Sequence, residues 1–434
     1  MRAKITRRTI VTLAILYFVS QLLFLINIQF PVGHNFDEFH YVPSAKQFLA
    51  LTRNQNWEHP PLAKLIMAAG IAMWGDRPIG WRFMSTIFGS LTLVGMYLWA
   101  LAVFADEETA LWVALITLVN QLLYVQARIG MLDTFMFGFL VWGVAAFCAT
   151  WNFGDSELSI RDSRRLLAFT GLMFGLGIAC KWFGVVPWAS CLLLVIAVKV
   201  MQNWRVVFLE GETTDWYNPA LWRGIQVRHW IRYLVLYPLL VYFITFLPFL
   251  FIKKNAAEYY GLWDLLKMQK TMYEGQLRVV SSHPYMSHWT DWPLMLRPIW
   301  YAFDKEGTNP VWTRGVLLLG NPLIMWGGLV ALAVCAWEWL EKKRRDAFLI
   351  VAFYVMFYVS WAVIPRKISF YYYYYPAGMT LSLALGLFFR KLSWLKWVFL
   401  GASVAMFIYF FPILAALRIP AESFHRWMWF RFWI

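Results

Sequence analysis

The chain has 434 residues, of which 61% are hydrophobic and 15% charged, and it carries 27 Trp, 21 Tyr and 36 Phe. This composition excludes an ordinary soluble domain, in which about a quarter of the residues are charged. The formal net charge is +15, but the Lys and Arg residues fall largely in short connections between apolar segments. We interpret them as topology signals and expect no nucleic-acid partner.

Apolar segments of the length that a helix needs to cross about 30 Å of hydrocarbon recur along the whole chain. The first of them has no small-residue cleavage site near its end, so we expect it to stay as an anchor. The pattern predicts an all-α polytopic membrane protein with about eleven transmembrane helices and a single domain over residues 1–434. The predicted spans are 9–30, 79–104, 108–126, 130–150, 166–181, 183–201, 231–252, 315–339, 347–364, 375–390 and 397–417.

Two connections are much longer than the others, residues 31–78 and 253–314. The first contains a shorter apolar stretch at 61–75, which predicts a helix lying in the membrane interface. Basic segments occur at 1–8, 161–165, 205–232, 341–345 and 390–396. They share one side if the helices alternate, and the excess of Lys and Arg predicts that this side is the cytoplasm. Both long connections and the C-terminus then face outward.

The cysteines indicate neither a disulfide framework nor a thiolate metal site, because none of the four forms a CxxC pair. His34, Asp37, Glu38 and His40 could together bind a divalent metal, but their spacing fits no common ligand pattern. We therefore predict no metal site. No internal repeat is evident, which argues against an inverted-repeat transporter.

Ionisable residues concentrate on the predicted outer face, which suggests a polar cleft at the membrane boundary. Each has a simpler interpretation. The acids of "HNFDEFHYV" (34–42) could be solvated loop residues, and Arg128 and Asp133 could form a structural ion pair. Lys181 could extend its charge to the interface. The five tyrosines 371–375 could belong to an interfacial aromatic belt.

The ordered set of motifs favours a catalytic site. It comprises the acid pair at 37–38, "HPPLAK" (59–64), Arg128 to Asp133 in "QARIGMLD", Lys181 followed by Trp182, and "HPYMSHWTDWPLMLRPIWY" (283–301). This set resembles the protein O-mannosyltransferase family, within the superfamily of membrane glycosyltransferases that use lipid-phosphate sugars. The resemblance covers nearly the whole chain, and 283–301 is its most specific part.

The resemblance implies an eleven-span fold of the C-type glycosyltransferases, a polyprenyl- or dolichyl-phosphate mannose donor, a Ser/Thr hydroxyl acceptor and inversion at the anomeric carbon. It implies no cofactor and leaves a divalent metal open. Asp37 matches the family's catalytic acid. Glu38 is expected to belong to the catalytic pair, either by positioning the acceptor or by supporting Asp37. Lys181, Arg366 and Arg82 are expected to bind the donor phosphate. The residues expected to support the site or bind the acceptor are His59, Lys64, Arg128, Asp133, His283, Tyr285, Trp292, Arg297 and Tyr373.

The chemistry requires these residue types. One carboxylate must take the proton of the attacking hydroxyl, and cations must stabilise the departing lipid phosphate. The lipid tail must stay in hydrocarbon, which places the site at the membrane surface.

The chain departs from the family at two points. Tyr373 replaces a His that usually precedes the proline, and connection 253–314 is too short for the soluble insertion of eukaryotic members. The consequence of Tyr373 stays open. The short connection suggests a compact prokaryotic member, which we place in the bacterial plasma (inner) membrane; the basic segments and the resemblance put its N-terminus in the cytoplasm and its site on the periplasmic side.

Alternatives remain open at the level of sequence. A relative could transfer another sugar, such as an aminoarabinose, or could modify a lipid or polysaccharide. A non-enzymatic lipid carrier or transporter is disfavoured, because transport pathways usually place ionisable groups deep in the bilayer.

Overall fold

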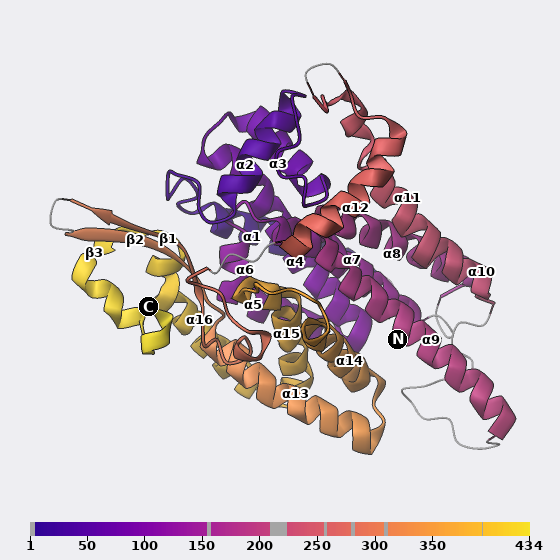
Figure 1. Ribbon diagram of the computed structural model, residues 1–434. Coiled ribbons are helices and arrows are strands. Elements are labelled where there is room, and N and C mark those ends of the chain that lie inside the picture. Colours follow the sequence, from indigo (N-terminus) through magenta and orange to yellow (C-terminus); the bar gives the residue numbers. More distant parts are fainter. Residues whose placement is uncertain are drawn as a thin grey trace.

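The computed structural model describes residues 5–153, 158–208, 224–255, 258–278, 283–307, 311–392 and 394–434. Helices dominate these residues (Figure 1). The α-helices are α1 (Arg7–Leu25), α2 (Glu38–Leu49), α3 (Leu62–Trp74), α4 (Pro78–Phe104), α5 (Glu107–Leu118), α6 (Gln121–Gln126), α7 (Leu132–Phe153), α8 (Ile160–Cys180), α9 (Val185–Phe208), α10 (Val227–Trp230), α11 (Tyr237–Ile244), α12 (Leu262–Arg278), α13 (Pro322–Lys342), α14 (Arg345–Val359), α15 (Tyr375–Phe389) and α16 (Leu395–Leu414).

Nine helical segments of the described residues are long and apolar enough to cross a membrane. This confirms the polytopic helical class. Two further predicted spans are helical but short. The segment predicted at 108–126 breaks between α5 and α6, where the Asn120 side chain accepts the Leu122 N–H at 3.1 Å, and α15 has only 15 residues. The count of eleven therefore stays a prediction.

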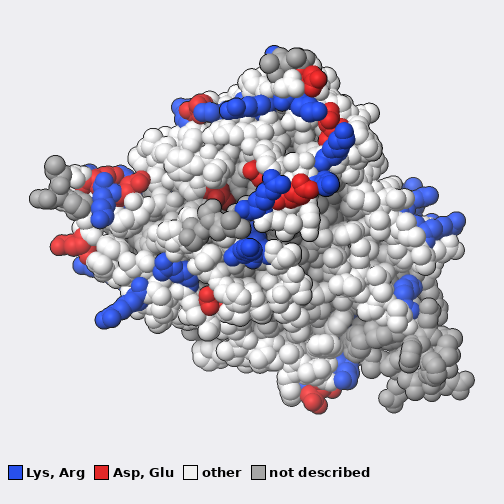
Figure 2. All heavy atoms as spheres, in the orientation of Figure 1, with Lys and Arg blue, Asp and Glu red and all other residues white. Residues whose placement is uncertain are grey.

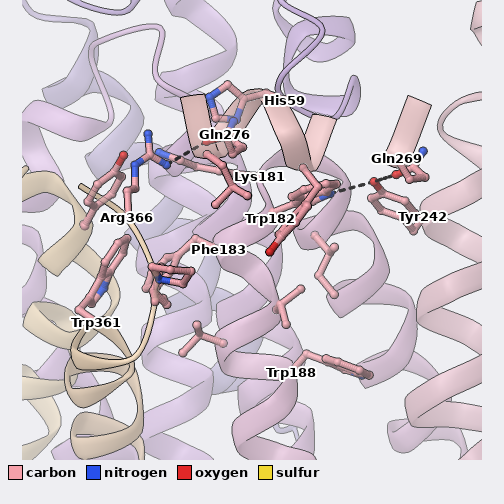
Figure 3. Close-up of a pocket in the computed structure, with 18 of the residues that line it drawn as sticks. His59, Lys181, Trp182, Phe183, Trp188, Tyr242, Gln269, Gln276, Trp361 and Arg366 are labelled. Carbon is pink, nitrogen blue, oxygen red and sulfur yellow. Dashed lines mark hydrogen bonds between the residues drawn. The ribbon is translucent and has the colours of Figure 1, made fainter. Parts of the chain in front are cut away.

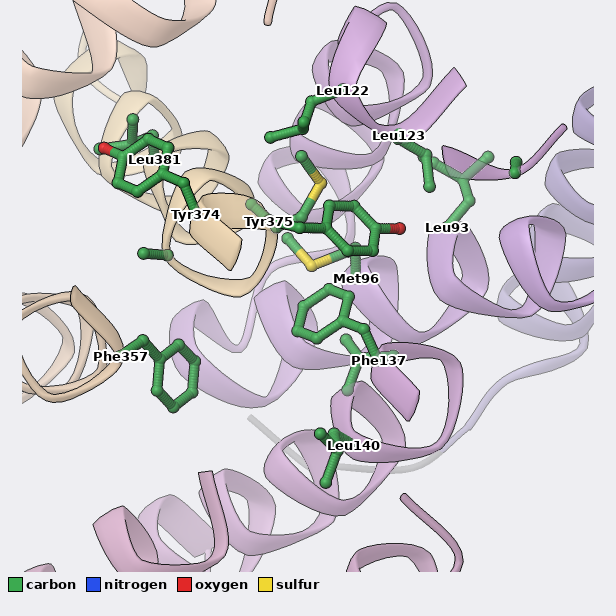
Figure 4. Packing of buried hydrophobic residues seen from close by; sticks show 14 of the residues in the cluster. Leu93, Met96, Leu122, Leu123, Phe137, Leu140, Phe357, Tyr374, Tyr375 and Leu381 are labelled. Carbon is green, nitrogen blue, oxygen red and sulfur yellow. The ribbon is translucent and has the colours of Figure 1, made fainter. Parts of the chain in front are cut away.

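α4 and α7 form the centre of the helix bundle. In the most apolar stretch of each helix, 78% of the residues of α4 and 83% of those of α7 are buried. The corresponding shares for α1 and α16 are only 22% and 28%. α1 and α16 therefore present most of their apolar surface outward, as helices facing lipid do. Leu93 of α4 and Phe137 of α7 pack around Tyr375 in this centre (Figure 4).

A small antiparallel sheet lies beside the helices and was not predicted. Its strands are β1 (Ile299–Glu306), β2 (Trp312–Leu318) and β3 (Ile419–Pro420), in the order β1-β2-β3. The span predicted at 315–339 was wrong at its start, because 315–318 belong to β2 and α13 begins at Pro322. Apolar runs of buried strands and helices look alike in sequence.

A helix is confirmed within the predicted segment 61–75, as α3, and α2 precedes it in the same connection. The place of α3 in the membrane interface stays a prediction. Connection 253–314 contains α12, β1 and the start of β2. α2 and α3 lie together at the top of Figure 1 with α12 beside them, and the N-terminus lies on the opposite side. Lys and Arg side chains, with some Asp and Glu, line the upper edge of the molecule, and a further cluster of charged side chains lies near the middle of this face (Figure 2).

Several predicted basic segments gather at the N-terminal end of the bundle. Arg8 faces Glu107 at 3.8 Å, Lys396 pairs with Glu108, and Arg390 donates to the carbonyl of Phe104 at 3.4 Å. Segment 161–165 opens α8. Residues 1–4 and 209–223 of the other basic segments lie outside the described residues. The alternation of helices that the sequence predicted is consistent with these contacts.

Candidate active site

Asp37 lies at the start of α2, on the face opposite the N-terminus. Its side chain is partly exposed, and one carboxylate oxygen, Oδ2, accepts a hydrogen bond from the Tyr41 hydroxyl at 3.0 Å. Burial raises the pKa of Asp37 above its ordinary value, and the Lys181 ammonium and the Tyr41 hydroxyl oppose that rise. A carboxylate whose pKa is raised by burial is a stronger base, as proton abstraction requires.

Glu38, the second acid of the pair, is fully buried and has a different environment. Its two oxygens accept from Arg82 Nε and Nη2, each at 2.8 Å, and from the backbone N–H groups of Gly130 and Asn35 at 2.8 and 2.9 Å. This fork geometry binds both charges tightly. Glu38 therefore fixes the loop that carries Asp37 and has no oxygen free for a substrate.

The geometry does not support Arg82 as a ligand of the donor phosphate. Beyond its two bonds to Glu38, its guanidinium donates to the carbonyls of Ile28, Pro31 and Gly33 at 3.2, 2.7 and 2.9 Å. These bonds use all five N–H donors of an arginine. Arg82 is also completely buried, so we assign it a structural role.

Asp133 pairs with Lys181 and not with Arg128. Lys181 Nζ lies 2.7 Å from Asp133 Oδ2, and both side chains are buried. Arg128 instead donates to the carbonyls of Leu414 and Ile26 at 3.0 and 2.7 Å. The simpler interpretation, an ion pair between Arg128 and Asp133, is therefore not supported, because Arg128 points toward the ends of α16 and α1.

The residues of the "HPPLAK" motif have separate roles. The buried Lys64 donates to the carbonyl of His59 at 2.9 Å and to Asn56, so it fixes the loop before α3. Burial lowers the pKa of His59 well below its ordinary value, and the charges of Lys181, Lys64 and Arg366 lower it further. The His59 imidazole is therefore neutral near neutral pH and can exchange hydrogen bonds without adding charge.

Aromatic rings surround the Lys181 ammonium. Its Nζ lies 4.8 Å from the ring centres of both Tyr372 and Tyr373. Tyr373 stacks on Trp361 at 4.4 Å, and Arg366 lies 5.1 Å from its ring. Tyr373 thus lies between the two cations predicted to bind phosphate.

A groove of about 560 Å³ opens beside these cations. Its polar end contains His59, Lys181, Gln276 and Arg366, and its other end reaches Trp188 (Figure 3). Apolar side chains dominate the rest of its lining; they include Ile178, Phe183, Val186, Pro238, Leu239 and Ile364.

α12 lies along the groove and is held there by side-chain hydrogen bonds. Tyr242 of α11 accepts from Trp182 Nε1 at 2.9 Å and donates to Gln269 of α12 at 2.6 Å. At the polar end, Arg366 donates to Gln276 of α12 at 3.2 Å (Figure 3). Arg366 also donates to the carbonyl of Ile368, so three of its five N–H donors remain for a ligand among the described contacts.

The segment 283–301 approaches the site from the second long connection. His283 lies 5.3 Å from the ring of Phe36, next to Asp37, and Trp292 lies edge-on to Trp361 at 5.3 Å. Arg297 lies 5.8 Å from the ring of Tyr285 and donates to backbone carbonyls. Neither Arg297 nor Tyr285 lines the groove.

Sequence reasoning missed several residues of the site. Tyr41 follows Asp37 by four positions on a helix, a spacing that brings side chains together, and this signal was available. Gln269 and Gln276 lie on α12, whose amphipathic pattern was not recognised within connection 253–314. Tyr242 and Trp361 look like ordinary apolar span residues.

The arrangement combines one basic carboxylate, two cations with unused donors and an apolar groove. It is suited to a donor with a charged head and a long apolar tail, and to removal of a proton from a hydroxyl nucleophile.

Comparisons with known proteins identify the family. The family model for dolichyl-phosphate-mannose-protein mannosyltransferase matches residues 77–254, and that for the C-terminal four-transmembrane region of protein-O-mannosyltransferase matches residues 262–433. The polyprenol-phosphate-mannose–protein mannosyltransferase of Mycobacterium tuberculosis is 25% identical over 81% of this chain and 74% of its own length. The protein of the same name from Mycolicibacterium smegmatis is 24% identical over 78% of this chain and 73% of its own length.

Solved structures show the same fold. A Pmt1-Pmt2 protein O-mannosyltransferase structure from S. cerevisiae, bound to the sugar donor, gives a TM-score of 0.80 at 14% identity, covering 100% of this chain and 93% of that chain. ArnT from Cupriavidus metallidurans gives 0.61 at 16% identity, covering 91% of this chain and 62% of that chain. With the two family models matching most of its length, the chain belongs to the protein O-mannosyltransferases, a family of membrane glycosyltransferases.

Proposed function

We propose that this enzyme transfers mannose, with inversion, from a polyprenyl-phosphate carrier to Ser or Thr hydroxyls of proteins, at the periplasmic face of the bacterial plasma membrane. The sugar and the protein acceptor follow from family membership and from the names of the mycobacterial relatives. The observation that carries the proposal is the groove, because its apolar length can hold an isoprenoid tail and its polar end lies beside Asp37. Lys181 of that end acts electrostatically on Asp37, and Tyr41, which donates to Asp37, lies 5.9 Å from the ring of His59.

In this proposal Asp37 is the general base. It takes the proton of the acceptor hydroxyl as the oxygen attacks the anomeric carbon, a contribution typically worth about 10²–10⁴-fold. The bond from that carbon to the phosphate oxygen breaks at the same time. The leaving phosphate is already ionised, so a single carboxylate suffices, and Asp37 keeps the proton until release.

Lys181 and Arg366 are proposed to bind the donor phosphate. Lys181 uses one of its three N–H donors for Asp133, and Arg366 has donors to spare, so both can contact phosphate oxygens that gain charge as the bond breaks. His59 and Gln276 lie at the same end of the groove and can bind the remaining oxygens or the sugar hydroxyls.

The decisive experiment supplies purified enzyme with radiolabelled polyprenyl-phosphate mannose and, in separate reactions, Ser/Thr peptides or membrane lipids. We expect label in the peptides, none in the lipids, and loss of transfer in a folded Asp37→Asn variant. Label in lipid alone would instead support the lipid-modifying alternative. A folded Asp37→Asn variant with more than about a tenth of the wild-type rate would exclude Asp37 as the base.

A further inference from the structure

Phe36, directly before Asp37, has a backbone conformation that residues other than glycine rarely adopt. Its φ is 49°, in the left-handed region, which an aromatic residue enters only when its surroundings force it. The surroundings here are rings from two distant parts of the chain, the segment 283–301 and the stretch before α15. Phe36 contacts Tyr301 of β1 at 5.2 Å, His283 at 5.3 Å and Phe370 at 5.6 Å.

The Asp37 side chain also lacks the capping hydrogen bond that is usual at its position. An aspartate at a helix N-cap normally accepts a bond from the backbone N–H groups of the first turn, but Asp37 makes no such bond to α2. Its carboxylate is turned to the Tyr41 hydroxyl, 3.0 Å away on the next turn of the same helix. Tyr41 is itself buried and lies edge-on to His59 at 5.9 Å.

We propose that Phe36 and Tyr41 are positioning residues that hold the Asp37 carboxylate in the one orientation from which it reaches the acceptor hydroxyl. The ring contacts of Phe36 hold its backbone in the left-handed conformation and so orient the backbone of Asp37. Tyr41 fixes the Asp37 carboxylate by its hydrogen bond. This inference rests on the proposed role of Asp37 as general base.

The Tyr41 hydroxyl also stabilises the ionised form of Asp37, because it donates to the carboxylate. Asp37 is surrounded by other titratable groups from each neighbouring element, so the pH effect of Tyr41 must be isolated by substitution. These groups are His40 of α2, Asp133 of α7, Lys181 after α8, Tyr301 of β1, Arg366 after α14 and Tyr372 before α15.

The first test is the pH profile of kcat/KM for a Ser/Thr peptide in Tyr41→Phe. This variant keeps the ring and removes only the hydroxyl. Loss of the donated bond should raise the pKa of Asp37, so the limb on which the rate rises with pH should move up by about one pH unit. At high pH the variant should approach the wild-type rate. Tyr97→Phe is the matched control. Tyr97 lies near the C-terminal end of α4, away from Asp37, so its substitution should leave the pH profile in place.

The second test compares Phe36→Ala with Phe36→Gly. Both remove the ring, so both should lower kcat by roughly ten- to a hundredfold while the KM for the lipid donor changes little. Glycine adopts positive φ freely, so Phe36→Gly should melt no lower than Phe36→Ala. A wild-type kcat in Phe36→Gly would show that the ring is not needed and would overturn the role of Phe36.

The outcomes separate this inference from the proposed function. An Asp37→Asn variant that remains active would remove the general base and with it both proposals. If Asp37→Asn is inactive but the pH profile of Tyr41→Phe rises at the same pH as that of the wild type, only the role of Tyr41 is overturned. A lowered rate plateau with an unmoved limb would likewise assign Tyr41 a structural role.

Discussion

Asp133 and Lys181 form a buried ion pair whose partners lie 48 positions apart in sequence. Removing one charge leaves the other buried without compensation, which costs about 3–5 kcal/mol. We therefore expect Asp133→Asn to lower the melting temperature of the detergent-solubilised protein clearly. Asp76→Asn is the matched control, because its pair with Lys46 is exposed, and such pairs contribute only about 0–1 kcal/mol. Equal melting of the two variants would contradict the buried pairing.

The cations at the groove should be measured by ligand binding. If Lys181 and Arg366 contact phosphate, Lys181→Ala and Arg366→Ala should each weaken binding of prenyl phosphate, the sugar-free product, by about 1.5–3 kcal/mol, the range of a charged hydrogen bond. Lys367→Ala is the control, since Lys367 is exposed and does not line the groove. Titration of folded protein in detergent measures the effect. Wild-type affinity in both groove variants would mean that other groups bind the phosphate.

Individual residue roles were harder to predict than residue identities. Arg128 and Asp133 are five positions apart, yet their side chains point to different elements, and only the folded chain shows that Arg128 meets the carbonyls of Leu414 and Ile26. The adjacent acids Asp37 and Glu38 point in different directions as well, because one ends a loop and the other begins a helix. A single sequence carries little information about such directions.

At the scale of elements, close packing of α8 against the segment that leads into α11 depends on Gly171. A Cβ at this position would lie 1.8 Å from the carbonyl oxygen of Tyr233, so Gly171→Ala should force the two helical segments apart and destabilise the protein by about 1–3 kcal/mol. Because the groove lies between α8, α9 and α11, we also expect weaker donor binding. Thermal unfolding and prenyl-phosphate titration measure the two effects.

Gly401 of α16 provides the control for this prediction. Among the described residues, no atom beyond the adjacent residues and backbone of its own helix lies within 4 Å of a Cβ added there, and alanine is favoured over glycine in a helix by up to about 1 kcal/mol. Gly401→Ala should therefore leave stability unchanged or raise it slightly. If Gly171→Ala behaved in the same way, the close approach of these helices would not limit stability.

Long apolar helices were predictable as elements, because their length and composition reflect the thickness of the bilayer. Short elements were not. The strand at 312–318 and α13 were read partly as one span, since their apolar residues run together. The break between α5 and α6 depends on one side chain, Asn120, and the sequence around it is otherwise apolar.

At the scale of the whole molecule, the short basic connections and the candidate site lie at different ends, although further Lys and Arg side chains also line the edge near α2, α3 and α12 (Figure 1, Figure 2). The basic segments with Arg8, Arg390 and Lys396 gather at one end, and Asp37 and the polar end of the groove lie at the other. The excess of Lys and Arg in short connections predicts that the first end faces the cytoplasm. The groove then opens to the outer leaflet, where both a lipid-linked sugar and an exported polypeptide can reach it.

This orientation can be tested with single cysteines, because the four native cysteines are all buried. Arg53→Cys places a thiol on the exposed loop after α2, and Arg161→Cys places one at the exposed start of α8. In spheroplasts, a membrane-impermeant maleimide should label Arg53→Cys directly, and should label Arg161→Cys only after the membrane is permeabilised. The unsubstituted protein should stay unlabelled in both conditions. The reverse pattern would place Asp37 and the groove in the cytoplasm, where an acceptor would be modified before export, and would overturn the periplasmic site.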